Sequence, residues 1–246
     1  MKESRPLGGS TTAYLFKFIL FSLIFVFIGG AICALWEYLG ESTAKPTASD
    51  IRPTVILDPG HGGPDGGATG LCSISEKELN LSVALTVRDI LTAAGVDVVM
   101  TRSEDVTLSD PDGGSRKSQD LRARKRIAES TPNAIFVSIH MNAFPIEKYS
   151  GLQVYFSRND PKSQAIASAV QSSVASSLQP DNDRKIKAAG ENIYLLHELD
   201  CPAVLIECGF LSNRAEAERL SSPEYRKALA LVIANSLLGT IYQNAS

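Results

Sequence analysis

Apolar residues divide this chain into an anchor-like beginning and a patterned remainder. Phe18 to Trp36 contains no charged residue and is dense in Phe, Ile and Leu. Since about 20 apolar residues are what a helix needs to cross a bilayer, residues 18–36 are predicted to form a transmembrane helix. Residues 37–53 are rich in Ser, Thr, Ala and Pro and show no apolar periodicity, which is typical of a linker.

The remainder, residues 54–246, alternates between two kinds of apolar pattern. Short β-branched or apolar runs predict strands at 54–57, 96–100, 134–139, 152–156, 193–196 and 203–207. Segments with apolar residues three or four apart predict helices at 79–94, 121–129, 163–178, 215–220 and 223–238. This alternation predicts one α/β domain with a central, mostly parallel but mixed sheet of about six strands and helices on both faces.

A long polar segment at 103–118 interrupts the alternation, with Pro111-Asp112-Gly113-Gly114 at its centre. Loops of this length in compact domains are often functional or mobile. The residues leave open whether this loop gates a site or binds an accessory activating protein. Nor does the sequence predict an oligomeric state.

Charges beside the apolar run predict its orientation. Lys2, Arg5 and Lys17 precede it and Glu37 follows. Because basic residues stay in the cytoplasm, residues 1–17 are predicted to be cytoplasmic and the domain to lie outside the cytoplasm. A cleaved signal peptide is the alternative, but Ala31-Ile32-Cys33 is a poor cleavage site, which favours an uncleaved anchor.

Net charge and cysteines exclude other classes of protein. The net charge is −3, and no basic stripe with interleaved aromatics is present, so nucleic acid is not an expected partner. Apart from Cys33 in the apolar run, the cysteines are Cys72, Cys201 and Cys208, an odd number that predicts no disulfide framework. Cys208 lies in an apolar run and is expected to be a small buried hydrophobe.

Two histidines and two glutamates fall where elements of the predicted sheet end or begin. His61 follows the first strand in a glycine-rich loop, His140 ends the third strand, Glu207 ends the last strand, and Glu76 begins the first helix of the domain. In open α/β sheets, sites form at the carboxyl ends of strands. Two imidazoles and a carboxylate are the ligands of a catalytic zinc site with an open fourth position, so these residues predict a zinc centre.

Alternatives remain for several of these residues. Spacing by itself does not choose between Glu76 and Glu78 as the acidic ligand, and His140 alone could be a hydrogen-bonded core histidine. The glycine-rich loop could cradle a nucleotide phosphate, but it lacks the Gly-Lys-Ser/Thr ending of a phosphate-binding loop. The remaining histidine, His197, is expected to have an ordinary surface role, with contact to substrate as the alternative.

Glu207 is the residue most indicative of catalysis. It follows Val204-Leu205-Ile206 and precedes Cys208. A carboxylate at the end of a buried strand is unfavourable unless it has a partner or a task. Beside a metal-activated water, it would act first as general base and then as proton donor to a leaving amine.

Four separated motifs carry a family resemblance that spans the domain from Val55 to Asn213. They are Asp58-Pro59-Gly60-His61-Gly62-Gly63, Glu76-Lys77-Glu78-Leu79-Asn80-Leu81, Ser138-Ile139-His140-Met141-Asn142-Ala143 and Glu207-Cys208-Gly209-Phe210-Leu211-Ser212-Asn213. In this order they resemble the zinc-dependent N-acetylmuramoyl-L-alanine amidases, which act on peptidoglycan. The resemblance implies that His61, Glu76 and His140 bind Zn²⁺, that Glu76 rather than Glu78 is the ligand, and that Glu207 is the catalytic acid/base.

Within that family the chain is most similar to the membrane-anchored spore-cortex amidases of spore-formers. The lone N-terminal anchor, the Gly-Gly-Ser-Arg-Lys insert before Asp120, and Tyr149-Ser150-Gly151-x-Gln153 carry this similarity. It implies removal of the stem peptide from muramic acid before a deacetylase closes a muramic δ-lactam. It also implies that the domain lies on the cell-wall side or in the forespore intermembrane space. A zinc peptidase of the stem peptide, an amidase of general wall turnover and a non-catalytic wall-binding module remain the alternatives.

Overall fold

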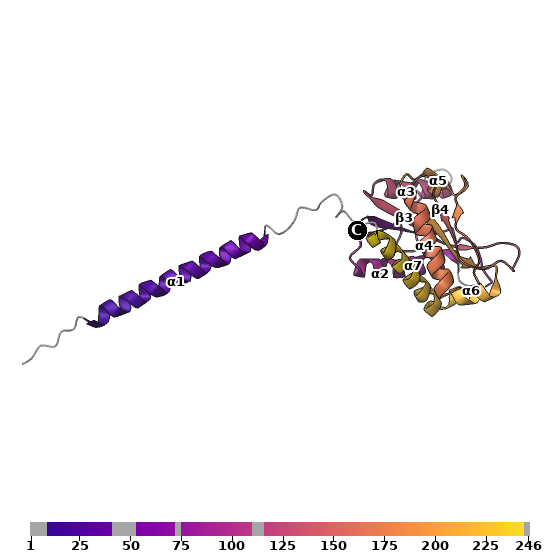
Figure 1. Ribbon diagram of the computed structural model, residues 1–246. Helices are drawn as coiled ribbons and strands as arrows, with labels where there is room; N and C mark the ends of the chain where they lie inside the picture. Colours follow the sequence, from indigo (N-terminus) through magenta and orange to yellow (C-terminus); the bar gives the residue numbers. More distant parts are fainter. Residues whose placement is uncertain (1–8, 41–52, 72–74, 110–115, 244–246) are drawn as a thin grey trace, which may run out of the picture. The chain divides into compact units, whose positions relative to one another are not determined.

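The computed structural model describes residues 9–40, 53–71, 75–109 and 116–243 (Figure 1). The chain divides into two units at Ile51 and Arg52. The first contains helix α1 (Gly9–Gly40), and its stretch Phe16–Trp36 is long and apolar enough to cross a membrane, with a mean hydropathy of 2.7. Length and composition fit a membrane anchor and a signal sequence alike. The helix runs past the expected end of the anchor at Trp36, and the predicted linker from residue 41 to 52 lies outside the described residues.

The second unit contains one six-stranded sheet in the order β2-β1-β3-β6-β4-β5. The strands are β1 (Thr54–Pro59), β2 (Val98–Met100), β3 (Ala134–Asn142), β4 (Gln153–Phe156), β5 (Lys187–Ala188) and β6 (Ala203–Phe210). All neighbours are parallel except β4 and β6, which are antiparallel. The predicted α/β domain with a mostly parallel, mixed sheet is therefore confirmed.

Helices cover both faces of this sheet. The larger core cluster joins one face to α2 (Glu76–Ala93), α4 (Lys162–Ser177) and α7 (Pro223–Gln243), which lie together in Figure 1. A smaller cluster joins the other face to α3 (Arg116–Glu129) and α5 (Tyr194–Glu198). Helix α6 (Arg214–Ser221) packs on α7 and β6. The two-sided cover explains why the central strands are apolar throughout.

Alternation along the central strands decides which side chains share the face of α3 and α5. Phe136 belongs to the smaller cluster, while Val137 and Ile139 belong to the larger one. Because successive side chains of a strand point to opposite faces, His140 lies on the same face as Phe136. Glu207 is the register partner of His140 on the adjacent strand β6. The two groups therefore lie side by side at the carboxyl ends of the two central strands.

One predicted strand is wrong. Residues 194–196 belong to helix α5, which covers Tyr194–Glu198. The outermost strand beside β4 is instead the two-residue β5. Leu195 and Leu196 are buried in the smaller cluster, which explains the apolar signal there. A run of four apolar residues does not distinguish a strand from one turn of a buried helix.

Helix α3 begins at Arg116, five residues before the predicted start at Leu121. The extra turn is polar, so no apolar periodicity announces it. Asp120, at the end of this extra turn, forms an ion pair with Arg124 in the next turn of the helix, and Asp120 Oδ2 lies 2.6 Å from Arg124 Nε. The helix therefore includes part of the predicted 103–118 loop, whose centre at 110–115 lies outside the described residues.

Candidate metal centre

The first histidine lies in a tightly turned loop after β1. His61 has a φ of 61°, and Gly62 and Gly63 also have positive φ. Glycine adopts such angles without strain, whereas other residues do so at a cost. Gly60 has a different role, because a Cβ there would overlap the imidazole of His140. Gly60 therefore lets the backbone of this loop lie directly against the second histidine.

A buried arginine holds this loop in place. Arg124 is 1% exposed. Its guanidinium donates to Asp58 Oδ1 at 2.6 Å, to the Pro59 carbonyl at 2.9 Å and to the His61 carbonyl at 2.8 Å. Its Nε donates to Asp120. Arg102 adds hydrogen bonds to the carbonyls of Pro59 and Gly60. The strained backbone at His61 is thus fixed from α3 and from the end of β2.

Asp58 is the buried counter-charge of Arg124. It also accepts hydrogen bonds from the hydroxyls of Thr101 and Ser138, each at 2.7 Å. Burial alone would raise the pKa of Asp58, but the charge of Arg124 and these hydrogen bonds hold it below its usual value. Asp58 is therefore a buried, ionised group that helps to position the loop through its ion pair with Arg124.

Three groups from different elements converge on one point. His61 Nε2 lies 3.2 Å from Glu76 Oε1, and His140 Nδ1 lies 3.0 Å from the same oxygen. The two imidazole rings are edge to face, with centroids 5.0 Å apart. One potential ligand atom from each of the three residues lies within 4.8 Å of the others. The folded chain therefore brings together the three residues expected from the sequence.

Glu76, and not Glu78, faces the histidines. Glu78 accepts hydrogen bonds from the backbone N–H and the hydroxyl of Ser75, and so engages the start of α2. Glu76 is 3% exposed and accepts backbone N–H bonds from Ala68 at 2.7 Å and Met141 at 3.1 Å. Burial alone would raise the pKa of Glu76, but hydrogen bonds and charge from the two histidines hold it below its usual range.

Asp65 supports the first histidine from the outside. Its Oδ2 lies 2.9 Å from His61 Nδ1, the ring nitrogen that faces away from Glu76. Metal-bound histidines almost always pair their second nitrogen with a carboxylate or carbonyl, which orients the ring. Asp65 lies two residues after the Asp58 to Gly63 motif, and sequence reasoning gave it no role; its position four residues after His61 was the available signal.

Glu207 lies beside this group without belonging to it. Its Oε2 is buried and has no hydrogen-bond partner among the described residues. Burial raises the pKa of Glu207 to about 7, with the histidines lowering it and Glu76 raising it. A carboxyl group with a pKa near neutrality and a free buried oxygen is suited to accept and return a proton. Its neighbour Cys208 is fully buried in the core, as expected from the sequence.

The three converging groups fit a zinc ion. Two imidazole nitrogens and one carboxylate oxygen form a ligand set of catalytic zinc sites, which leave a further position open. Glu76 held in its ionised form supplies the charged ligand that such a site requires. The other histidine, His197, is exposed on α5 and does not line the site.

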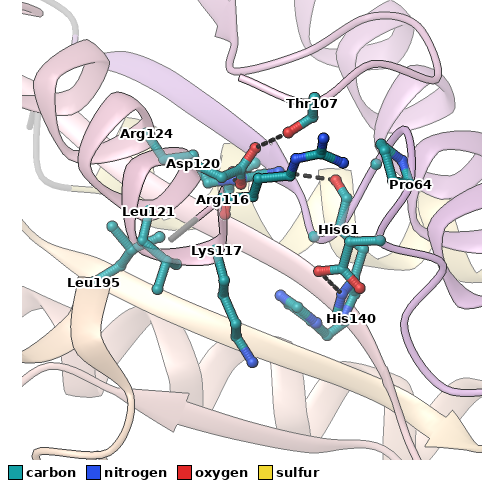
Figure 2. A pocket seen from close by; sticks show the side chains of 14 residues that line it. His61, Pro64, Thr107, Arg116, Lys117, Asp120, Leu121, Arg124, His140 and Leu195 are labelled. Atoms are coloured by element: carbon teal, nitrogen blue, oxygen red, sulfur yellow. Dashed lines mark hydrogen bonds and ion pairs between the residues drawn. The ribbon is translucent and has the colours of Figure 1, made fainter. Parts of the chain in front are cut away.

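A pocket of about 440 Å³ opens beside the two histidines (Figure 2). Both imidazoles line it, together with the loop around Pro64 and Asp65, helix α3, and Leu195 of α5. Two of the three metal-ligand candidates therefore border a space large enough for part of a substrate.

Known proteins are similar to this chain in sequence and in fold. The family model described as N-acetylmuramoyl-L-alanine amidase matches residues 55–238. The germination-specific N-acetylmuramoyl-L-alanine amidase of Bacillus subtilis is 36% identical over 208 residues, which cover 82% of this chain and 86% of that relative.

Solved structures extend the similarity. The CwlD amidase from Clostridioides difficile, solved in complex with the GerS lipoprotein, has a TM-score of 0.74 and 33% identity, covering 78% of this chain and 99% of its own. The amidase AmiC2 of Nostoc punctiforme has a TM-score of 0.67 and 31% identity over 76% of this chain and 96% of its own. The chain therefore belongs to the N-acetylmuramoyl-L-alanine amidase family and is a peptidoglycan hydrolase of that activity.

Proposed function

We propose that His61, Glu76 and His140 bind a catalytic Zn²⁺ and that Glu207 is the acid/base of amide hydrolysis. The observation that carries the metal assignment is the convergence of one donor atom from each of the three residues within 4.8 Å. The free buried oxygen of Glu207, adjacent in register to His140, supports the catalytic assignment.

The bond cleaved joins the lactyl group of N-acetylmuramic acid to L-alanine of the stem peptide. Zinc, when bound, polarises the amide carbonyl and acidifies a water molecule. Glu207 accepts the proton of the attacking water and then donates it to the departing amine nitrogen of L-alanine. The raised pKa of Glu207, about 7, suits both steps near neutral pH. Asp65 keeps the His61 ring oriented, and the Arg124 hydrogen bonds keep the His61 backbone in its left-handed conformation.

The biological role that fits best is removal of stem peptides from the spore cortex, ahead of muramic δ-lactam formation. Support comes from the Bacillus subtilis relative, which is a germination-specific amidase and matches over most of both chains. The anchor over residues 18–36, with 1–17 in the cytoplasm, would keep the domain at 54–246 on the wall side of a membrane. The apolar stretch Phe16–Trp36 supports this arrangement.

An accessory protein is part of the proposal. The Clostridioides difficile CwlD amidase was solved together with a lipoprotein, GerS. A membrane-attached partner would find this domain at the same membrane surface, because the anchor would hold the domain there and the partner would have its own attachment.

The test is digestion of purified peptidoglycan by the full-length chain in mild detergent, with and without a chelator, followed by mass spectrometry. The proposal expects released peptides that begin with L-alanine, and loss of release on chelation with recovery after Zn²⁺ is added. Products cut within the stem peptide would identify a zinc peptidase instead. Binding without hydrolysis in the presence of Zn²⁺ would identify a wall-binding module.

The cortex role has a separate test. Deletion of the gene in its own organism should remove muramic δ-lactam from the cortex while leaving vegetative wall composition unchanged. A mutant cortex with normal δ-lactam content would instead favour a role in general wall turnover.

A further inference from the structure

The pocket beside the two histidines has an uneven distribution of charge. Three of its lining residues are acidic, namely Asp58, Asp65 and Asp120, and three are basic, namely Arg116, Lys117 and Arg124. Only some of these six charged groups form ion pairs within the protein. The groups that remain unpaired are the ones that could contact a ligand.

All three carboxylates and one of the cations are engaged. Arg124 lies between Asp58 and Asp120, with contacts of 2.6 Å to each. Asp65 pairs with the ring of His61 at 2.9 Å. These contacts are internal, and all four groups have structural roles in holding the loop that carries His61.

Arg116 and Lys117 are different. Within the part of the chain that the structure describes, neither forms an ion pair or hydrogen bond through its side chain. Both are exposed at the start of α3 and both line the pocket (Figure 2). Among the described charged groups that line the pocket, the two without an internal partner are therefore both cations, and both lie on its exposed rim.

Apolar groups form the rest of the wall beneath these cations. Leu121, one turn after Lys117, and Leu195 of α5 both face the pocket, and Pro64 borders it on the loop side. An apolar floor with two cations at its rim suits a short chain of methyl and methylene groups that carries a carboxylate.

The chemistry of the substrate indicates which part of it matches. In peptidoglycan the lactyl carboxyl of muramic acid is the acyl side of the scissile amide and carries no charge, and the acetamido sugars are neutral. The carboxylates belong to the stem peptide. We infer that this pocket binds the stem peptide on the leaving-amine side of the scissile bond, and that Lys117, assisted by Arg116, pairs with a stem-peptide carboxylate. This inference rests on the proposed function, because it places the substrate relative to the zinc ligands.

Lys117 would then determine specificity rather than perform chemistry. Charge pairing at an exposed rim should act on substrate binding, and so mainly on KM. An amidated stem peptide, which has lost its negative charge, should be cleaved more slowly at low concentration than the free acid. Added salt should reduce the difference, because exposed charges are screened.

The experiment uses the full-length, zinc-loaded chain in mild detergent. Its two substrates are an N-acetylmuramoyl tripeptide with free carboxylates and the same compound with its carboxylates converted to carboxamides. For the unmodified enzyme, kcat/KM should be about two- to fivefold higher for the acid, the size expected for a charge pair at an exposed rim. Lys117→Gln should bring the acid-to-amide ratio close to one through a higher KM for the acid, with kcat retained.

Arg122→Gln is the matched control. Arg122 is an exposed cation on the same helix that does not line the pocket, so this variant should keep the wild-type ratio. An unchanged ratio in Lys117→Gln, or equal cleavage of both substrates by the wild type, would overturn the pocket assignment while leaving the amidase intact. Failure of the wild type to cut either substrate between muramic acid and L-alanine would instead overturn the proposed function, and the pocket assignment with it.

Discussion

Replacing Arg124 by Met tests whether the loop that carries His61 depends on a buried ion pair. Met has a similar length and no charge, so the substitution removes the charge without leaving a large cavity. It deletes hydrogen bonds to Asp58, Asp120 and the carbonyls of Pro59 and His61. Asp58, 1% exposed, would keep only the two hydroxyl contacts. Breaking a buried pair by removing one partner costs about 3–5 kcal/mol.

That magnitude can be measured by thermal unfolding of the full-length chain in detergent, followed by circular dichroism. Tryptophan fluorescence would not serve, because the only tryptophan is Trp36 in the apolar helix. For a domain of this size each kcal/mol corresponds to roughly 2–4 °C, so the midpoint should fall by roughly 6–20 °C. Lys125→Met is the control. Its ion pair with Glu198 lies on the exposed side of the same helix, so its midpoint should stay near the wild-type value.

The pH dependence gives an independent check. In the wild type the folded-state pKa of Asp58 lies below its usual value of 3.8, so its contribution to stability is present at neutral pH and is lost as pH falls through that lowered pKa. Without Arg124, burial raises the pKa of Asp58 and only the hydroxyl hydrogen bonds of Thr101 and Ser138 oppose it, so acid should neutralise the stranded charge more readily. The loss of stability in Arg124→Met should therefore be smaller at pH 4 than at pH 8.

Two outcomes would refute this reasoning. One is a midpoint within a degree of the wild type at pH 8, and the other is a loss that grows toward acid. The double variant Asp58→Asn/Arg124→Met should lose less than the sum of the two single variants, because the partners lie in direct contact. Simple additivity would mean that the ion pair does not carry the effect.

Further predictions concern the centre itself. Gly60→Ala should lower bound zinc and activity together, because the new Cβ would overlap the His140 ring; normal zinc content by metal analysis would contradict the packing. Glu76→Gln should weaken zinc binding by at least about tenfold, whereas Glu78→Gln, two residues along the same helix, should bind zinc like the wild type. Glu207→Gln should keep the fold and the zinc but lose at least about 100-fold in kcat, since general acid–base catalysis contributes that much; substantial turnover would remove Glu207 from the mechanism.

Much of the fold followed from local pattern. The strands at the sheet centre and the long amphipathic helices were predictable because burial on one or both faces imposes a periodicity on the sequence. The helix turn at 116–120 and the helix at Tyr194–Glu198 were not. The first is held by charge pairing and the second by contacts with distant residues, and neither leaves a periodic signal.

By itself the sequence determined the chemical inventory of the site. Local pattern alone places the two histidines and two glutamates at strand ends or at a helix start. The carboxyl ends of parallel strands meet at one edge of a sheet, so these residues could be expected to lie together. Only the tertiary structure decided how these groups are used. Glu76 faces inward while Glu78 caps its helix, because the helix start fixes the direction of each side chain. Arg124 and Asp58, 66 residues apart, became the support of the loop, because a buried charge pair forms only when the fold brings both partners out of water together.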